Sequence, residues 1–147
     1  MKLSSRLPTV ARVLLGLVFL VFGLNGFLHF LPQPPPPTGA LAFMGGLAST
    51  GYFFPLLKAT EVIGGALLLA GFVPIALTLL APIIVNIVAF HAFVAPGNWP
   101  VVGIVLVSEI YLAIVNRAAF APLFTRSRRP APAEVAAPLA PPVRRAA

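Results

Sequence analysis

The sequence predicts an all-α fold, a membrane-embedded bundle of four antiparallel helices. Hydrophobic residues make up 59% of the 147 residues, charged residues only 9%, and the mean hydropathy is +1.00, which is far outside the range of soluble globular domains. Four apolar stretches are each long enough to cross a bilayer, and turns rich in Pro and Gly separate them. The Lys and Arg residues gather near the two ends of the chain.

The first span is predicted over about residues 10–31, a length that reaches across a hydrocarbon core of about 30 Å. No small-x-small cleavage site follows the apolar run, so we interpret it as a retained helix and not as a signal peptide. The connection that follows is free of charge, and its stretch Ala40 to Ser49 predicts a short helix at the membrane surface.

The second and third spans are predicted over about residues 55–72 and 74–94, with a tight turn between them. Trp99 marks a membrane interface, and the fourth span follows over about residues 101–117. Residues 1–125 therefore form one four-span domain. Residues 126–147 are rich in Pro, Ala and Arg and cannot build a core, which predicts a disordered cytoplasmic tail.

Basic residues precede the first span and follow the fourth, whereas the two outward connections contain neither Lys nor Arg. By the positive-inside rule both termini are cytoplasmic, in a multi-pass protein of the bacterial inner (plasma) membrane. The net charge of +7 is explained by this distribution, so no nucleic-acid partner is predicted. The expected partners are the lipid bilayer and either a redox partner protein or a second copy of the chain.

Cysteine is absent, which excludes disulfides, thiolate metal sites, iron–sulfur clusters and dithiol redox chemistry in this chain. No phosphate-binding loop or nucleophile–base arrangement is visible, so no catalytic residue is predicted and the pattern favours a non-catalytic protein. No cofactor or metal is predicted either. A quinone is compatible with the sequence, whereas two histidines without a spacing motif are weak grounds for haem or a metal site.

Polar residues nevertheless occur inside all four spans. A carboxylate in hydrocarbon is costly unless it finds a partner, water or a proton, so such residues mark candidate sites. Helix rise places the candidates other than His91 in one layer, about 3–12 Å below the outer boundary of the membrane. His91 lies at a similar depth but on another face of its helix. The candidates for a ligand or proton pocket are Asn25, His29, Lys58, Glu61, Asn86, His91 and Glu109.

Each candidate also has a structural interpretation. Lys58 and Glu61 lie three apart, and are either a local ion pair or a ligand or proton site. Glu109 has no close partner on its own helix, which favours function slightly over pairing with another helix. Asn25 and Asn86 are the kind of residue that more often makes interhelical hydrogen bonds.

Three stretches of the chain resemble the DoxX family of small four-helix membrane proteins. They are the Arg12 with Gly16 opening of the segment 11–26, the Glu61 with Gly64-Gly65 signature in the segment 58–71, and the segment 86–91. The resemblance covers roughly residues 5–125. The chain lacks the Gly-Pro-Gly and Ser-Leu-Asp ending that many members show after the last span, and the cysteine pairs of distantly similar thiol-redox proteins.

What the resemblance implies is a four-helix architecture and, more loosely, an accessory subunit of a quinone-linked or redox-linked membrane complex. In that reading a small polar pocket in the outer half of the bilayer contacts a quinone-like or other amphiphilic ligand. Glu61 and Glu109 would carry protons or accept hydrogen bonds there, and Lys58, His29 and Asn86 would orient them. The alternatives are a small proton-coupled transporter and a purely structural membrane scaffold.

Overall fold

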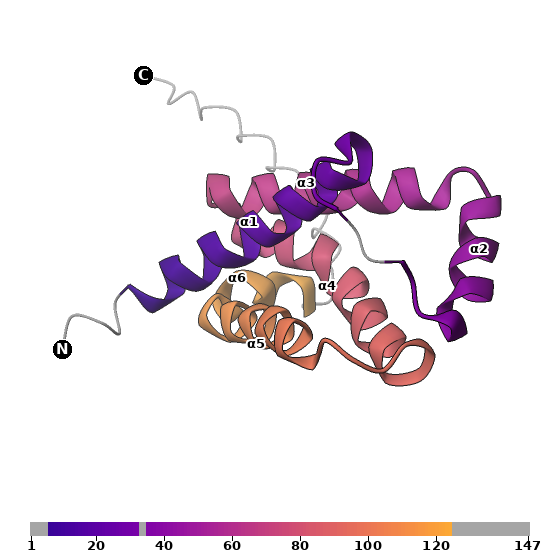
Figure 1. The fold of residues 1–147 in the computed structure, drawn as a ribbon. Helices are drawn as coiled ribbons and strands as arrows, with labels where there is room; N and C mark the ends of the chain where they lie inside the picture. Colours follow the sequence, from indigo (N-terminus) through magenta and orange to yellow (C-terminus); the bar gives the residue numbers. More distant parts are fainter. Residues whose placement is uncertain (1–5, 33–34, 125–147) are drawn as a thin grey trace, which may run out of the picture.

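The structure is a computed structural model of the chain and describes residues 6–32 and 35–124. All regular secondary structure in these residues is helical, which confirms the predicted all-α class (Figure 1). The long helices are α1 (Leu7–Leu28), α3 (Phe53–Ala70), α4 (Val73–Ala89), its π-helical extension η2 (Phe90–Val94), and α5 (Trp99–Val115). The short ones are η1 (Thr38–Ala40), α2 (Leu41–Ser49), α6 (Arg117–Phe120) and η3 (Ala121–Phe124). The tail predicted for residues 126–147 lies outside the described residues.

Three helical segments, α1, α3 and α4 with η2, are long and apolar enough to cross a membrane. α5 with α6 and η3 makes a fourth only if both parts count as one span, because the chain bends by 75° between them. At the bend, the side-chain amide of Asn116 donates to the carbonyl of Leu112 over 2.8 Å. The last long helix therefore covers residues 99–115, two residues earlier at each end than the predicted span.

The four long helices contact one another in a closed ring, in which α1 packs against α3 and α5, and α4 packs against the same two helices. Apolar side chains from all four fill the centre. Those that are 2% exposed or less are Leu15, Leu68, Ala76, Leu77, Leu80, Ile84 and Leu112. Many large apolar side chains on the outside of the ring are exposed instead. This inverted distribution is the one expected where a bilayer covers the outer surface.

Glycines allow α1 and α3, the pair with the most extensive contact, to approach closely. A Cβ atom at Gly65 would lie 2.6 Å from the backbone nitrogen of Leu20 and 2.8 Å from the carbonyl oxygen of Gly16. Further along, a Cβ at Gly23 would meet Val62 and Glu61. Because residue numbers rise on α1 as they fall on α3, the two helices are antiparallel. Small residues at such crossings let backbones pack directly against each other.

Arg12 of α1 links this helix to the C-terminal end of α3. Its guanidinium Nη1 donates to the carbonyls of Leu68 and Leu69, over 2.7 and 2.9 Å. These carbonyls belong to the last turn of α3, where Leu68 also accepts from the backbone N–H of Gly71 over 3.1 Å, and a cation there suits the helix dipole. Gly71 then turns the chain with φ of +93°, a left-handed conformation that glycine adopts without strain.

The predicted short helix is present as η1 and α2, and lies across the end of the ring where α1 finishes and α3 begins (Figure 1). Ala40 is fully buried, and the rings of Phe43 and Phe90 lie 6.0 Å apart, centroid to centroid. Most other side chains of α2 are exposed. α2 therefore packs against the rest of the structure through only part of its surface.

Candidate functional site

A partly open cleft of about 850 Å³ lies between α2 and the ring of long helices, and is here called the main cleft. Its walls are mainly apolar, with many aromatic rings. Six polar side chains interrupt them: Lys58, Thr60, Glu61, Asn86, His91 and Asn98. Apolar pockets with a few convergent polar groups are the usual form of small-molecule sites.

Lys58 and Glu61 form an ion pair on one face of α3. The Lys58 Nζ lies 2.7 Å from Glu61 Oε2, and the two side chains are 24% and 6% exposed. The aliphatic stem of Lys58 crosses α1 at Gly26, where an added Cβ would collide with its Cγ and Cδ atoms. The pair is thus a local one, as the spacing allows, and it is also part of the cleft wall.

His91 and Asn86 reach the cleft from α4 and its extension, and both use one side-chain atom within their own helix. The His91 Nδ1 lies 2.8 Å from the carbonyl oxygen of Ile87, and the Asn86 Nδ2 donates to the carbonyl of Pro82 over 2.8 Å. Neither contact joins two helices, so the interhelical hydrogen bond expected of Asn86 is not formed. The π-helical turn that carries His91 was not foreseen, because its Phe90-to-Ala95 hydrogen bond has no sequence signature.

Asn25 and His29 do not line the cleft. The Asn25 side chain is 1% exposed, accepts from the backbone N–H of Leu31 over 2.6 Å, and so secures the loop after α1. His29 follows the last helical residue in a left-handed conformation, with φ of +52°, and its side chain is exposed. His29 therefore lies just beyond the helix that carries Asn25. α1 ends at Leu28, three residues before the predicted Leu31.

Glu109 lies apart from the other candidates. It is 7% exposed and faces the core of the ring together with Val105 and Leu112, but it is not part of the cleft wall. Its Oε2 is fully buried and has no hydrogen-bond partner among the described residues. Helix rise places it about 15 Å from the start of α5 and about 9 Å from its end. Glu61 and Glu109 are thus in different surroundings.

α2 supplies part of the site that the sequence did not indicate. Phe43, Met44 and Leu47 line the cleft, together with residues of the four long helices. Their spacing of three and four residues marks one face of a helix, which is the signal that was available. Asn98 and Thr60 were also missed, because one lies in a turn and the other donates to Leu56 of its own helix.

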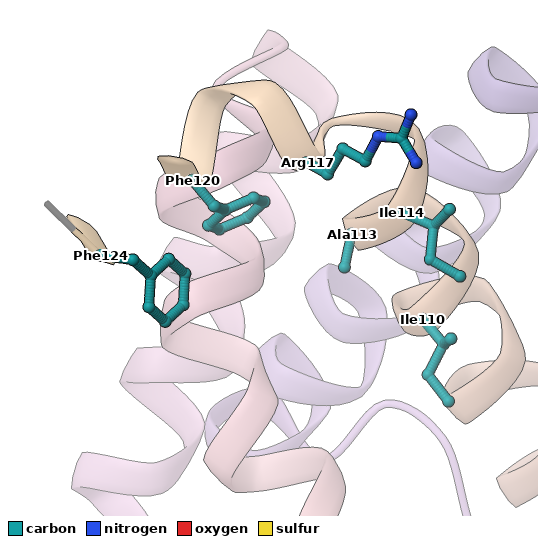
Figure 2. A pocket seen from close by; sticks show the side chains of 6 residues that line it. All are labelled: Ile110, Ala113, Ile114, Arg117, Phe120 and Phe124. Carbon is teal, nitrogen blue, oxygen red and sulfur yellow. The ribbon is translucent and has the colours of Figure 1, made fainter. Parts of the chain in front are cut away.

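A second, shallower depression of about 470 Å³ lies at the bend after α5. Figure 2 shows Ile110 and Ile114 on one side, Phe120 and Phe124 on the other, and Arg117 between them. None of the candidate residues lines it. No group of three or more His, Asp or Glu side chains that could hold a metal ion occurs in residues 6–32 and 35–124.

Comparison with known proteins gives no relative: no family model, no curated protein and no solved structure matches the chain. The resemblance to the DoxX family therefore stays a prediction, and the function has to be argued from the cleft.

Proposed function

We propose that the chain is a multi-pass protein of the bacterial inner membrane, with four antiparallel spans and both termini in the cytoplasm. The exposed apolar surface of the long helices supports membrane insertion. Arg12 and Arg117 lie at the end of the ring opposite α2, where α1 begins and α5 ends. This arrangement supports a basic cytoplasmic side, with α2 on the outer surface.

Within this membrane protein the main cleft binds a small amphiphile with a quinone-like polar head and an apolar body. The observation that carries the proposal is the combination of a largely apolar, partly open cavity of about 850 Å³ with the Lys58–Glu61 pair and His91 in its wall. Apolar walls suit the body of such a ligand, and a few polar groups orient its head. The chain then acts as an accessory, non-catalytic subunit of a redox-linked membrane complex, as the DoxX resemblance implies.

The roles follow from the positions of the side chains. Lys58 donates to the head group, His91 and Asn86 orient it, and Glu61 holds Lys58 in place or exchanges a proton with the ligand. Glu109, His29 and Asn25 take no part in binding, because they do not line the cleft.

The single tryptophan of the chain provides the test. Asn98 lines the cleft and Trp99 is the next residue in the chain, so a quinone bound in the cleft should quench the fluorescence of Trp99. We expect saturable quenching by decylubiquinone when the protein is held in phosphatidylcholine nanodiscs. Ala89 lines the cleft and Ala66 is exposed away from it, so Ala89→Phe should weaken binding by about tenfold or more while Ala66→Phe leaves it unchanged.

Quenching that does not saturate, or that both variants share with the parent, would rule the ligand site out. Native mass spectrometry of the gently extracted protein completes the test, since it shows whether a quinone or a second polypeptide comes with the chain.

A purely structural scaffold is the competing function, and one observation favours it. The side chains of Asn25, Asn86 and His91 each form a hydrogen bond with a nearby backbone group, and those of Lys58 and Glu61 bond to each other. A scaffold would keep its polar groups satisfied in this way without any ligand. It would show no saturable quinone binding, and the same titration therefore decides between the two functions.

A further inference from the structure

We propose that the main cleft selects amphiphiles whose head group is uncharged. The inference rests on the ligand-binding role proposed above, and it adds the chemistry of the ligand's head. It follows from how the charges in the cleft wall are arranged.

The described part of the cleft wall carries one cation and one carboxylate, and they neutralise each other. Lys58 and Glu61 are in direct contact at 2.7 Å, and no other Lys, Arg, Asp or Glu among the described residues lines the cleft. Apart from the His91 imidazole, the wall therefore carries no net charge. A site of this kind gives an ionic head group no charge to pair with.

Separating Lys58 from Glu61 to bind an anionic ligand has a high free-energy cost. Glu61 is the deeper partner, and Lys58 is its only hydrogen-bond partner among the described residues. An anion that drew Lys58 away would leave the Glu61 carboxylate buried and unpaired, which is the costly case for a buried ion pair. The stem of Lys58 also lies against Gly26 on α1, which restricts where the ammonium group can move.

An uncharged head group can bind while the pair stays intact. An ammonium group has three N–H donors, so Lys58 can bond to Glu61 and still donate to a carbonyl or hydroxyl oxygen. The His91 Nδ1 points its hydrogen at the Ile87 carbonyl, which leaves Nε2 of a neutral ring as an acceptor for a hydroxyl. The cleft thus offers one donor and one acceptor to a head group that carries carbonyl or hydroxyl oxygens.

The test compares three ligands that share a dodecyl chain and differ in head charge: dodecanol, dodecyl phosphate and dodecyltrimethylammonium. Each displaces the quenching quinone from the protein in phosphatidylcholine nanodiscs, at about pH 8 so that imidazole is neutral. Four proteins are compared: the parent, Glu61→Gln, Lys58→Met and the double variant. Because partitioning of each ligand into the bilayer is the same for all four, ratios between proteins report the cleft alone.

We expect the parent and the double variant to prefer dodecanol. Glu61→Gln leaves Lys58 without its counter-ion and should bind dodecyl phosphate about tenfold more tightly than the parent does, while Lys58→Met should shift the same way toward dodecyltrimethylammonium. A parent that binds dodecyl phosphate as well as dodecanol, or single variants with unchanged preference, would overturn the inference while ligand binding itself stands. If the quinone itself gives no saturable quenching, the proposed function fails and the inference fails with it. Should a single variant not fold, the ranking in the parent and the double variant still decides.

Discussion

Two acidic residues of this chain are buried to a similar extent and differ in what surrounds them. Glu61 contacts Lys58, whereas Glu109 has a buried carboxylate oxygen with no partner among the described residues. Removing one member of a buried pair leaves the other unpaired, but removing an unpaired buried group removes a cost. The same substitution should therefore have opposite effects at the two positions.

We predict that Glu109→Leu raises the free energy of unfolding and that Glu61→Leu lowers it, each by about 1–3 kcal/mol. Leucine at position 109 joins Val105 and Leu112 in the core, while leucine at position 61 strands the ammonium group of Lys58. Thermal unfolding of the three proteins in one detergent measures the difference. A Glu109→Leu variant that is destabilised as strongly as Glu61→Leu would show that Glu109 has a partner after all, and that the scaffold role extends to it.

The sequence identifies the costly residues, because a charge or an amide within an apolar run is visible directly. It does not reveal what each residue contacts. The sequence predicts His29 within the first span, but α1 ends before His29 and the Asn25 side chain binds the backbone of Leu31. A shift of three residues at a helix end was enough to move a candidate out of the site.

Between helices, the closest approach is the crossing of α1 and α3 at glycines. The contact at Gly65 is with backbone atoms of Leu20 and Gly16, which cannot rotate away as a side chain can. On α5, Gly103 has nothing within 4 Å of an added Cβ. The two glycines thus provide a matched pair, one at a helix crossing and one on an open helix face.

We predict that Gly65→Ala destabilises the protein by about 1–3 kcal/mol, since the helices must move apart to admit a methyl group. Gly103→Ala should be neutral or stabilise it by up to about 1 kcal/mol, because alanine is the better helix former. Unfolding in sodium dodecyl sulfate, followed by circular dichroism, measures both. Equal effects of the two substitutions would contradict the close crossing, because helix propensity alone would then explain the results.

At the level of helices, periodicity and turn residues predicted where the long helices and the short helix occur, to within a few residues. They could not predict that α2 would form a wall of the main cleft. That role depends on the contact of Phe43 with Phe90 and on the burial of Ala40, which join segments about fifty residues apart. Contacts between residues this far apart in the sequence leave no periodic pattern in either segment.

At the scale of the whole molecule, the membrane orientation predicted from the Lys and Arg residues has to be consistent with the arrangement of the helices. α2 and the main cleft lie toward one end of the ring, and Arg12 and Arg117 lie at the other. Composition predicted an all-helical, apolar chain, but which turns of α5 line the cleft depends on packing between distant segments: Val105 is part of the wall, whereas Glu109 lies one turn beyond it.

Labelling of single cysteines tests this orientation, because the natural chain has none. Ser49 on α2 and Ala118 on α6 are both exposed, so neither substitution disturbs the core. We predict that Ser49→Cys reacts with a membrane-impermeant maleimide on intact cells, whereas Ala118→Cys reacts only after the cells are permeabilised. The reverse pattern would put the main cleft on the cytoplasmic side, and labelling of both positions in intact cells would mean that the bent segment of α5 and α6 does not complete a fourth crossing. Only the predicted pattern leaves the cleft open to a ligand in the outer half of the bilayer.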